Sequence, residues 1–358
     1  MKPRWIAALL VVAPLIASAK EWTVANLAGT GTARGADEAA GTKAINDPYG
    51  LVRGPDGALW FCEHNGHRIS RLAPDGTLSV IAGTGIKGYS GDGGPALAAT
   101  LNLPHELRFG SDGALYIADT GNNVVRRIDL STGIITTFAG TGKRGYTGDG
   151  GPAAQATFQG PHSIQFDVTG QLYVCDVGNH AIRRIDPKSG IISTIAGTGK
   201  AGPTPDGAPL AGTPFNNPRS LDLDRDGNPW IVTREGNQVF KLDLKAGVIR
   251  LMGGTGQPGF TGNGGPALAA TLSGPKGIAL DSAGNAWLVD TESHSIRRIN
   301  AATGNLELML GTGARGDGPV GKATDCALNR PHGVFVDADG SVLIGDSEAH
   351  RIRVLRAE

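Results

Sequence analysis

Short alternations of hydrophobic and polar residues recur along the chain with a regular period, and each recurrence starts at a proline. Successive prolines are 56, 57, 57, 57 and 56 residues apart, so the 358-residue chain holds six copies of one unit. The six are Pro48, Pro104, Pro161, Pro218, Pro275 and Pro331. A repeat of this length indicates an architecture of stacked supersecondary units.

Each copy predicts four β-strands separated by turns. In the third copy the first strand alternates through Ile164 and Phe166, whereas the segment 172–175 is apolar on both faces. A strand that is apolar on both faces is covered on both sides, as it is between stacked sheets. Glycine-containing turns separate the strands. The sequence therefore predicts an all-β protein, a six-bladed β-propeller with four-stranded blades.

The two ends of the chain predict how the ring closes. The sixth copy stops after its third strand, at Glu358. The segment 23–31, TVANLAGTG, matches the fourth strand of the other copies and the Gly-Thr-Gly run that follows it. We therefore expect the N-terminal strand to pair with the last blade, which closes the ring and removes free sheet edges.

The first residues have the pattern of a cleavable secretory signal. Two basic residues precede an apolar stretch over 5–16, and an Ala-Ser-Ala run ends at Ala19. We expect residues 1–19 to be a signal peptide cut after Ala19, and residues 20–358 to be one propeller domain that is secreted or periplasmic. The apolar stretch is too short to span a bilayer comfortably, and we expect no membrane span in the mature chain.

Composition narrows the classes of protein to consider. Glycine makes up 56 of the 358 residues, which suits many tight turns and argues against a helical bundle. Lys plus Arg and Asp plus Glu both number 33, without a basic stripe, so we expect no nucleic-acid partner. Of the three cysteines, Cys62 and Cys175 occupy equivalent repeat positions, and we interpret them as small core residues.

The repeat resembles a known family. The segments GNNVVRRID (121–129) and GNHAIRRID (178–186) are similar to the NHL repeat. The loops GYSGDGGPALAATL (88–101) and GYTGDGGPAAQATF (145–158) resemble those of exported bacterial NHL-repeat propellers. The resemblance covers nearly all of residues 22–358 and implies a six-bladed propeller. It says little about function, because one scaffold hosts many activities.

One position in each repeat varies while its surroundings stay nearly constant. The residue after each repeat proline starts the innermost strand, so it is expected to line the mouth of the central channel. Packing within a blade explains such variation poorly, and we therefore predict a ligand-binding site there. These six mouth residues are Tyr49, His105, His162, Arg219, Lys276 and His332.

Three of the mouth residues raise a metal hypothesis, with His105, His162 and His332 as ligands. Three histidines with an open position are typical of catalytic zinc. The fold also resembles that of the peptidyl-hydroxyglycine lyases, which implies a zinc held by histidines of alternate blades. Blades two and six fit that pattern, but blade four carries Arg219.

Carboxylates raise Ca²⁺ as a second candidate metal. An acidic residue closes the second strand in five of the six copies: Glu63, Asp119, Asp176, Asp290 and Asp346. Oxygen ligands of this kind suit Ca²⁺. Their near-uniform recurrence instead favours a structural role, in which each carboxylate accepts backbone N–H bonds.

Two classes of function remain open. The mixed His, Arg, Lys and Tyr mouth favours a non-catalytic binding scaffold for a protein, peptide or glycan of anionic or polar character. The alternative is a metal-dependent enzyme centred on the channel, similar to the peptidyl-hydroxyglycine lyases or to the gluconolactonases. The sequence shows no nucleophile elbow, zincin helix or Cys/His dyad that would favour catalysis.

Overall fold

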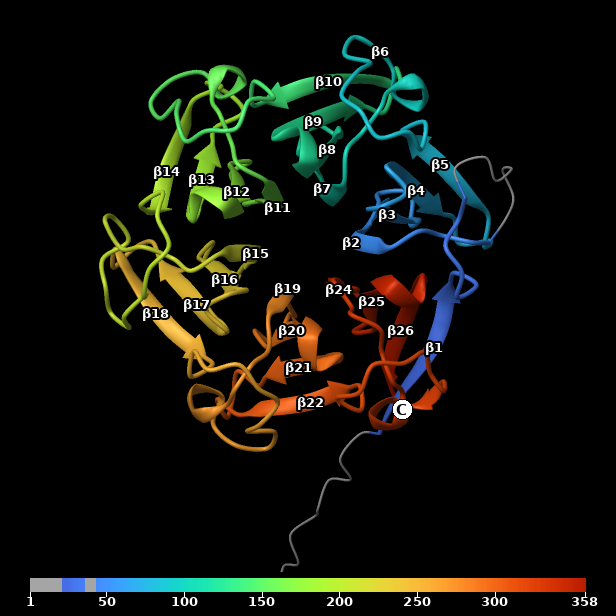
Figure 1. Cartoon of the computed structure of the whole chain (residues 1–358), viewed down its shortest axis with the longest axis vertical. Helices are drawn as coiled ribbons and strands as arrows, with labels where there is room; N and C mark the ends of the chain where they lie inside the picture. Colours follow the sequence, from blue (N-terminus) through green and yellow to red (C-terminus); the bar gives the residue numbers. More distant parts are fainter. Residues whose placement is uncertain (1–20, 36–42) are drawn as a thin grey trace, which may run out of the picture.

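Six antiparallel sheets stand around a common axis in the computed structural model, which describes residues 21–35 and 43–358 (Figure 1). In every sheet the first strand of the repeat is innermost and its next strands pair in order toward the outside; two of the sheets have a short fifth strand, which lies outermost. This arrangement confirms the predicted six-bladed β-propeller. The expected signal peptide, residues 1–19, lies outside the described residues.

The strand bounds follow the repeat, with blades numbered in chain order. Blade one comprises β2 (Pro48–Arg53), β3 (Leu59–Glu63), β4 (Arg68–Leu72) and β5 (Leu78–Ala82). Blade two comprises β7 (Pro104–Phe109), β8 (Leu115–Asp119), β9 (Val124–Asp129), β10 (Ile134–Ala139) and the short β6 (Gly94–Pro95). Blade three comprises β11 (Pro161–Phe166), β12 (Leu172–Asp176), β13 (Ala181–Ile185) and β14 (Ile192–Gly197).

The second half of the ring repeats this organisation. Blade four comprises β15 (Pro218–Leu223), β16 (Pro229–Thr233), β17 (Gln238–Asp243) and β18 (Val248–Gly253). Blade five comprises β19 (Pro275–Leu280), β20 (Ala286–Asp290), β21 (Ser295–Ile299) and β22 (Leu306–Leu310). Blade six comprises β24 (Gly333–Val336), β25 (Val342–Asp346), β26 (Arg351–Ala357), β1 (Trp22–Ala28) and the short β23 (Gly321–Lys322).

The two ends of the chain share the last blade, as the sequence predicts. Strand β1 pairs antiparallel with β26, and Val24 lies opposite Leu355 in the register. Figure 1 shows β1 beside β26 at the point where the ring closes. Because β1 comes from the N-terminus and β26 from the C-terminus, this pairing ties the first and last strands of the chain into one sheet.

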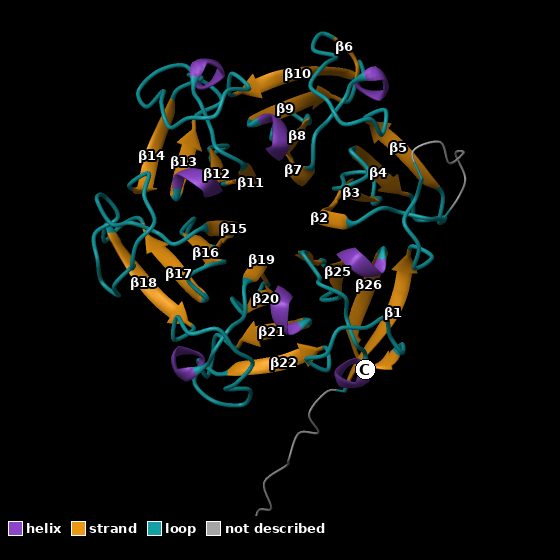
Figure 2. Cartoon of the chain, in the orientation of Figure 1, coloured by secondary structure: helices purple, strands orange, loops and turns teal. Residues whose placement is uncertain are grey.

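Helical structure is confined to short 3-10 turns in the part of the chain that the structure describes (Figure 2). They are η1 (Ala96–Ala98), η2 (Thr120–Asn122), η3 (Ala153–Gln155), η4 (Val177–Asn179), η5 (Ala267–Ala269), η6 (Thr291–Ser293), η7 (Ala323–Asp325) and η8 (Ser347–Ala349). None of the helices in residues 21–35 and 43–358 has the length and apolar character to cross a membrane.

The hydrophobic core lies between neighbouring blades. Ile69 of blade one and Ile117 of blade two are both fully buried in one cluster, and Trp60 packs edge-on against Phe109 at 5.4 Å between ring centroids. Cys62 is buried in the same cluster as a free thiol. Each blade therefore buries apolar side chains against its neighbours, which favours a complete ring over separate sheets.

The carboxylates that close the second strands have the structural role that their recurrence predicts. Asp119 accepts a hydrogen bond from the backbone N–H of Asn102 at 2.7 Å and lies 3.4 Å from the guanidinium of Arg126. Equivalent Asp–Arg pairs occur in blades three, five and six. The backbone bond reaches the loop before the blade rather than the following turn, so each carboxylate holds its leading loop.

One hydrogen bond to a side-chain acceptor joins each blade to the next, which makes six such bonds around the ring. The residue before each repeat proline donates its backbone N–H to a His or Asn of the preceding blade; for example, Asn217 donates to His180 Nδ1 at 3.2 Å and Gly160 to Asn123 Oδ1 at 3.0 Å. The last bond runs from Asp47 to His350 and closes the ring. We call these bonds the latches, and their acceptors are His67, Asn123, His180, Asn237, His294 and His350.

Replacing a latch acceptor tests its contribution to stability. His180 has a φ of 49°, a left-handed conformation that Asn tolerates better than Ala. We expect His180→Ala to lower the free energy of unfolding by about 1–3 kcal/mol, because the part-buried Asn217 N–H loses its acceptor. His180→Asn is the matched control and should stay within about 0.5 kcal/mol of the wild type, since Asn makes the same bond in blade two. Equal urea midpoints for the two variants would contradict a latch role.

Candidate functional site

The ring brings all six mouth residues into one contiguous cluster. Each is the second residue after a latched backbone N–H, with the repeat proline between, so the latches fix where the side chains start. The ring of Tyr49 stacks on His332 at 4.1 Å and meets His105 edge-on at 4.9 Å, and His105 meets His162 at 4.6 Å. Arg219 and Lys276 complete the cluster through contacts with His105 and His332. Their role in binding stays a prediction.

Only part of the cluster is open to a ligand. His105, Lys276 and His332 are buried, with 4%, 3% and 5% of their surface exposed, whereas Tyr49, His162 and Arg219 are partly exposed. Beneath them lies a cavity of about 10 Å³, lined in part by His105, Lys276 and His332. A space of this size holds about one water molecule. A ligand would therefore meet Tyr49, His162 and Arg219 first.

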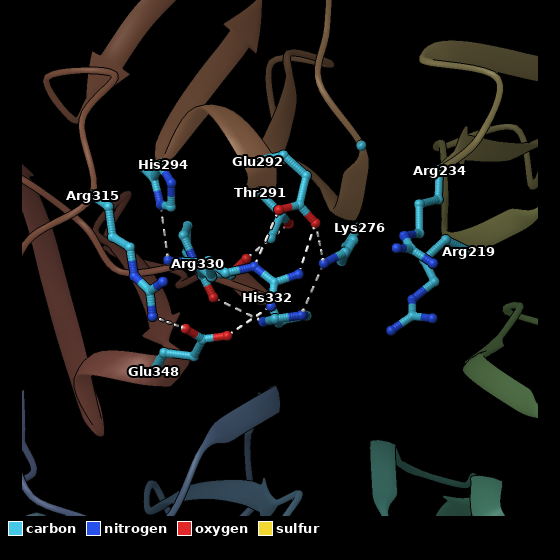
Figure 3. Close-up of polar contacts among 12 residues, drawn as sticks. Arg219, Arg234, Lys276, Thr291, Glu292, His294, Arg315, Arg330, His332 and Glu348 are labelled. Carbon is cyan, nitrogen blue, oxygen red and sulfur yellow. Dashed lines mark hydrogen bonds and ion pairs between the residues drawn. The ribbon is translucent and has the colours of Figure 1, made fainter. Parts of the chain in front are cut away.

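Two residues of the cluster were missed by the sequence analysis. His64 stacks on Tyr49 at 4.0 Å, and Arg234 lies beside Arg219 (Figure 3). Both occupy the position directly after the second strand, where the other blades carry Thr120, Val177, Thr291 and Ser347. This position varies between blades as the mouth position does, so the same comparison of the six repeats at this position would have found both residues.

Carboxylates neutralise the cations on one side of the mouth. Glu292 lies 2.8 Å from Lys276 Nζ and also pairs with Arg330, which in turn pairs with Glu348 at 2.7 Å. Figure 3 shows these acids interleaved with the cations of blades five and six. Burial lowers the pKa of Lys276 to about 8, which leaves the amine mainly protonated at pH 7. The blade-five side therefore carries paired charge.

Arg219 is the exception at the mouth. Among the described residues, its guanidinium has no carboxylate within ion-pair distance; Nη2 lies 3.1 Å from His105 Nε2, and Nε is buried without a hydrogen-bond partner. Burial lowers the pKa of Arg219 to about 10, so the side chain stays charged at neutral pH. The neighbouring Arg234 adds positive potential, partly offset by its pair with Glu235 at 3.1 Å. The mouth thus holds a cation without a counter-ion.

The histidines do not add charge. Burial lowers the pKa of His64 to about 3 and holds the pKa values of His105, His162 and His332 well below the ordinary histidine value, with the nearby cations acting in the same direction. All four are therefore neutral at pH 7 and offer flat, polar surfaces rather than charge.

The zinc hypothesis fits this arrangement poorly. In residues 21–35 and 43–358 no group of three or more His, Cys, Asp or Glu side chains is placed to hold a metal ion. The Nε2 atom of His105 faces Arg219, and that of His332 lies 3.3 Å from Lys276 Nζ. A metal at these nitrogens would have to displace both cations. The predicted set His105, His162 and His332 does not form a ligand cage, and the carboxylates considered for Ca²⁺ are held apart in separate blades.

Comparisons with known proteins agree with the fold. A family model described as NHL repeat matches residues 158–185 and 328–355. The chain is 27% identical over 268 residues to Protein SUPPRESSOR OF QUENCHING 1, chloroplastic, of Arabidopsis thaliana, covering 72% of this chain and 25% of that protein. It is 28% identical over 275 residues to NHL repeat-containing protein 2 of Bos taurus, covering 68% and 38%. The chain thus spans less than half the length of these relatives.

Solved structures of several activities share the architecture. An auxiliary nutrient binding protein from Bacteroides thetaiotaomicron superposes with a TM-score of 0.69 at 14% identity, covering 95% of this chain and 77% of that one. Virginiamycin B lyase from Staphylococcus aureus gives a TM-score of 0.54 at 18% identity, covering 94% and 100%. A gluconolactonase from Xanthomonas campestris gives 0.59 at 12% identity, covering 88% and 87%. At these identities the likeness shows the fold alone.

The neutral state of His64 predicts a pH dependence of stability. Its pKa is about 3 in the folded protein and about 6.5 in the unfolded chain, so below pH 6.5 the unfolded chain binds a proton that the folded protein does not. This contribution is fully present above pH 6.5 and is lost as the pH falls. When the pH falls from 7 to 5, the free energy of unfolding of the wild type should therefore decrease by up to about 2 kcal/mol more than that of His64→Gln. Urea denaturation at both pH values measures the difference, and parallel pH profiles would contradict a neutral, buried His64.

Proposed function

We propose that this six-bladed β-propeller with NHL repeats is a non-catalytic binding protein that captures an anionic ligand at one mouth of its channel. The observation that carries the proposal is Arg219, a partly buried cation with no acidic partner among the described residues. Burying a charge without a partner opposes folding. A bound anion would supply the missing partner and turn this cost into affinity.

The surroundings of Arg219 suit a carboxylate or a similar planar anion. A guanidinium offers a fork of N–H donors that matches such groups in a bidentate manner. Tyr49 and His162 are the other partly exposed mouth residues, and both are uncharged at neutral pH because burial raises the pKa of Tyr49 to about 12 and depresses that of His162. They would pack against the remainder of the ligand without competing for its charge.

Catalysis has less support than binding. The metal-dependent alternative, a lyase or lactonase, requires a metal site that the mouth histidines fit poorly. The same histidines are weak general bases, since their pKa values are depressed and two of their Nε2 atoms face cations. The ligand classes that remain are a protein, peptide or glycan with an anionic group. The N-terminal pattern supports action outside the cytoplasm, with Lys20 as the first residue of the exported protein.

Two matched substitutions test the role of Arg219. Arg219→Met removes an unpaired charge and should raise the free energy of unfolding by about 1–3 kcal/mol, while it removes the part of the stabilisation by acetate or sulfate that comes from binding at Arg219. Lys276→Met removes a paired charge and should instead lower the free energy of unfolding by about 1 kcal/mol, because Glu292 loses one of its partners.

Both proteins and the wild type are unfolded with urea in acetate, sulfate or chloride at equal ionic strength. The wild type should gain more stability from acetate or sulfate over chloride than Arg219→Met gains, because exclusion of these anions from the surface stabilises both proteins and only the wild type also binds them. Loss of stability in Arg219→Met, together with an undiminished response to these anions, would refute the proposed site.

A further inference from the structure

In blades two, three and five, an aromatic ring fills the space between the blade and its leading loop, the loop that precedes the first strand. Tyr89, Tyr146 and Phe260 of the leading loops lie over the buried guanidiniums of Arg126, Arg183 and Arg297, each 5.2 or 5.3 Å from the charge to the ring centroid. The same rings lie against a glycine after the fourth strand, so that a Cβ on Gly142 would come within 3.0 Å of Tyr89. Ring and guanidinium together occupy the space between leading loop and blade.

Blade four lacks every part of this filling. The aromatic position holds Pro203, the Arg position holds Phe240, and the Asp position holds Thr233. The Asn of blades two and three, whose side chain bonds the leading loop, is Gly236 here. Both members of the buried ion pair are replaced together, so no charge is left unpaired inside the blade.

The missing side chains leave an open groove of about 420 Å³, which is within the range of small-ligand sites. It is lined by Pro203, Thr204, Asn216, Thr233, Glu235 and Gln238, and it reaches Gly256, the counterpart of Gly142. The lining is mixed, apolar and polar, and its Asn, Gln and Thr side chains offer amide and hydroxyl groups as both donors and acceptors. We call this space the blade-four groove.

Two adjacent residues, Glu235 and Arg234, connect the blade-four groove with the charged mouth. Glu235, which lines the groove, pairs with Arg234 at 3.1 Å, and Arg234 lies beside Arg219 (Figure 3). Asn216 of the groove and Arg219 of the mouth belong to the same short segment before and within β15. The path therefore runs from an unpaired cation at the channel to a carboxylate in the groove.

We propose that the blade-four groove is a second subsite, which holds the body of a short peptide whose C-terminal carboxylate rests on Arg219. The inference depends on the anion site proposed above and extends it outward along blade four. Asn216, Gln238 and Thr204 match the N–H and C=O groups of an extended peptide, and Glu235 suits its N–H groups or its amino terminus.

An acidic glycan matches this path less well. A chain with repeated carboxylates would bring one of them against Glu235, and like charges at close range repel. No aromatic ring is among the residues that line the groove, so sugar faces have no stacking surface there. The polarity of the path, positive at the channel and negative in the groove, matches the polarity of a peptide.

Restoring the aromatic filling of the other blades tests the inference. Pro203→Tyr should place a ring against Gly256, as Tyr89 and Tyr146 do against Gly142 and Gly199, and close the groove without touching Arg219. Pro203→Ala is the matched control, because it changes the same position and leaves the groove open. The probes are tetra-alanine, N-acetyl-alanine and a galacturonate tetramer, each titrated by calorimetry into the purified protein.

We expect the wild type and Pro203→Ala to bind tetra-alanine at least tenfold more tightly than N-acetyl-alanine, and Pro203→Tyr to lose that tenfold advantage with unchanged affinity for N-acetyl-alanine. If N-acetyl-alanine binds but tetra-alanine is no tighter, or if Pro203→Tyr leaves the advantage intact, the groove is not a subsite and the anion site still stands. Tighter binding of the galacturonate tetramer than of tetra-alanine would overturn the peptide assignment. If no probe binds the wild type, both proposals fail.

Discussion

The latch between successive blades is the interaction on which the rest of the structure depends. A backbone N–H just before each inner strand donates to a His or Asn side chain of the preceding blade. Part-buried backbone donors of this kind need an acceptor, so the bond fixes the spacing between neighbouring sheets. The mouth residue follows two positions later. The same six bonds that hold the ring together therefore place six side chains of different chemistry around one axis.

In the described part of the chain, cations have acidic partners inside the blades and, with one exception, at the mouth. In blades two, three, five and six, the buried arginine of the third strand has the aspartate of the second strand within 3.4 Å, and in blade four both partners are absent. At the mouth, Lys276 and Arg330 have glutamate partners. Arg219 departs from this rule, because no carboxylate within the described residues reaches it. Proteins keep such locally unfavourable features mainly where function requires them, which is why this residue anchors the proposed site.

The fold was predictable because it rests on features that a single sequence displays. Proline spacing revealed the repeat, and the spare strand around Val24 predicted the partner of the strand that ends near Leu355. The mouth residues were also predictable, since variation at one repeat position marked them. What the sequence analysis missed depends on side-chain reach. His64 and Arg234 come from a different repeat position, directly after the second strand, and whether Glu292 pairs with Lys276 or Arg219 is a matter of geometry. The blade-four groove results from several residue differences between blade four and the other blades, and the space that they leave together depends on how the side chains pack.

The central claim is that the mouth holds an unpaired cation that recruits an anion, and anomalous scattering from bromide tests it most directly. Crystals of the protein grown in bromide, with no other anion in excess, should show an anomalous peak in contact with the guanidinium of Arg219. Crystals of Arg219→Met should lack that peak while they keep bromide elsewhere on the surface. A mouth without bromide in the wild type, or an Arg219 side chain turned onto a carboxylate of its own chain, would contradict the account.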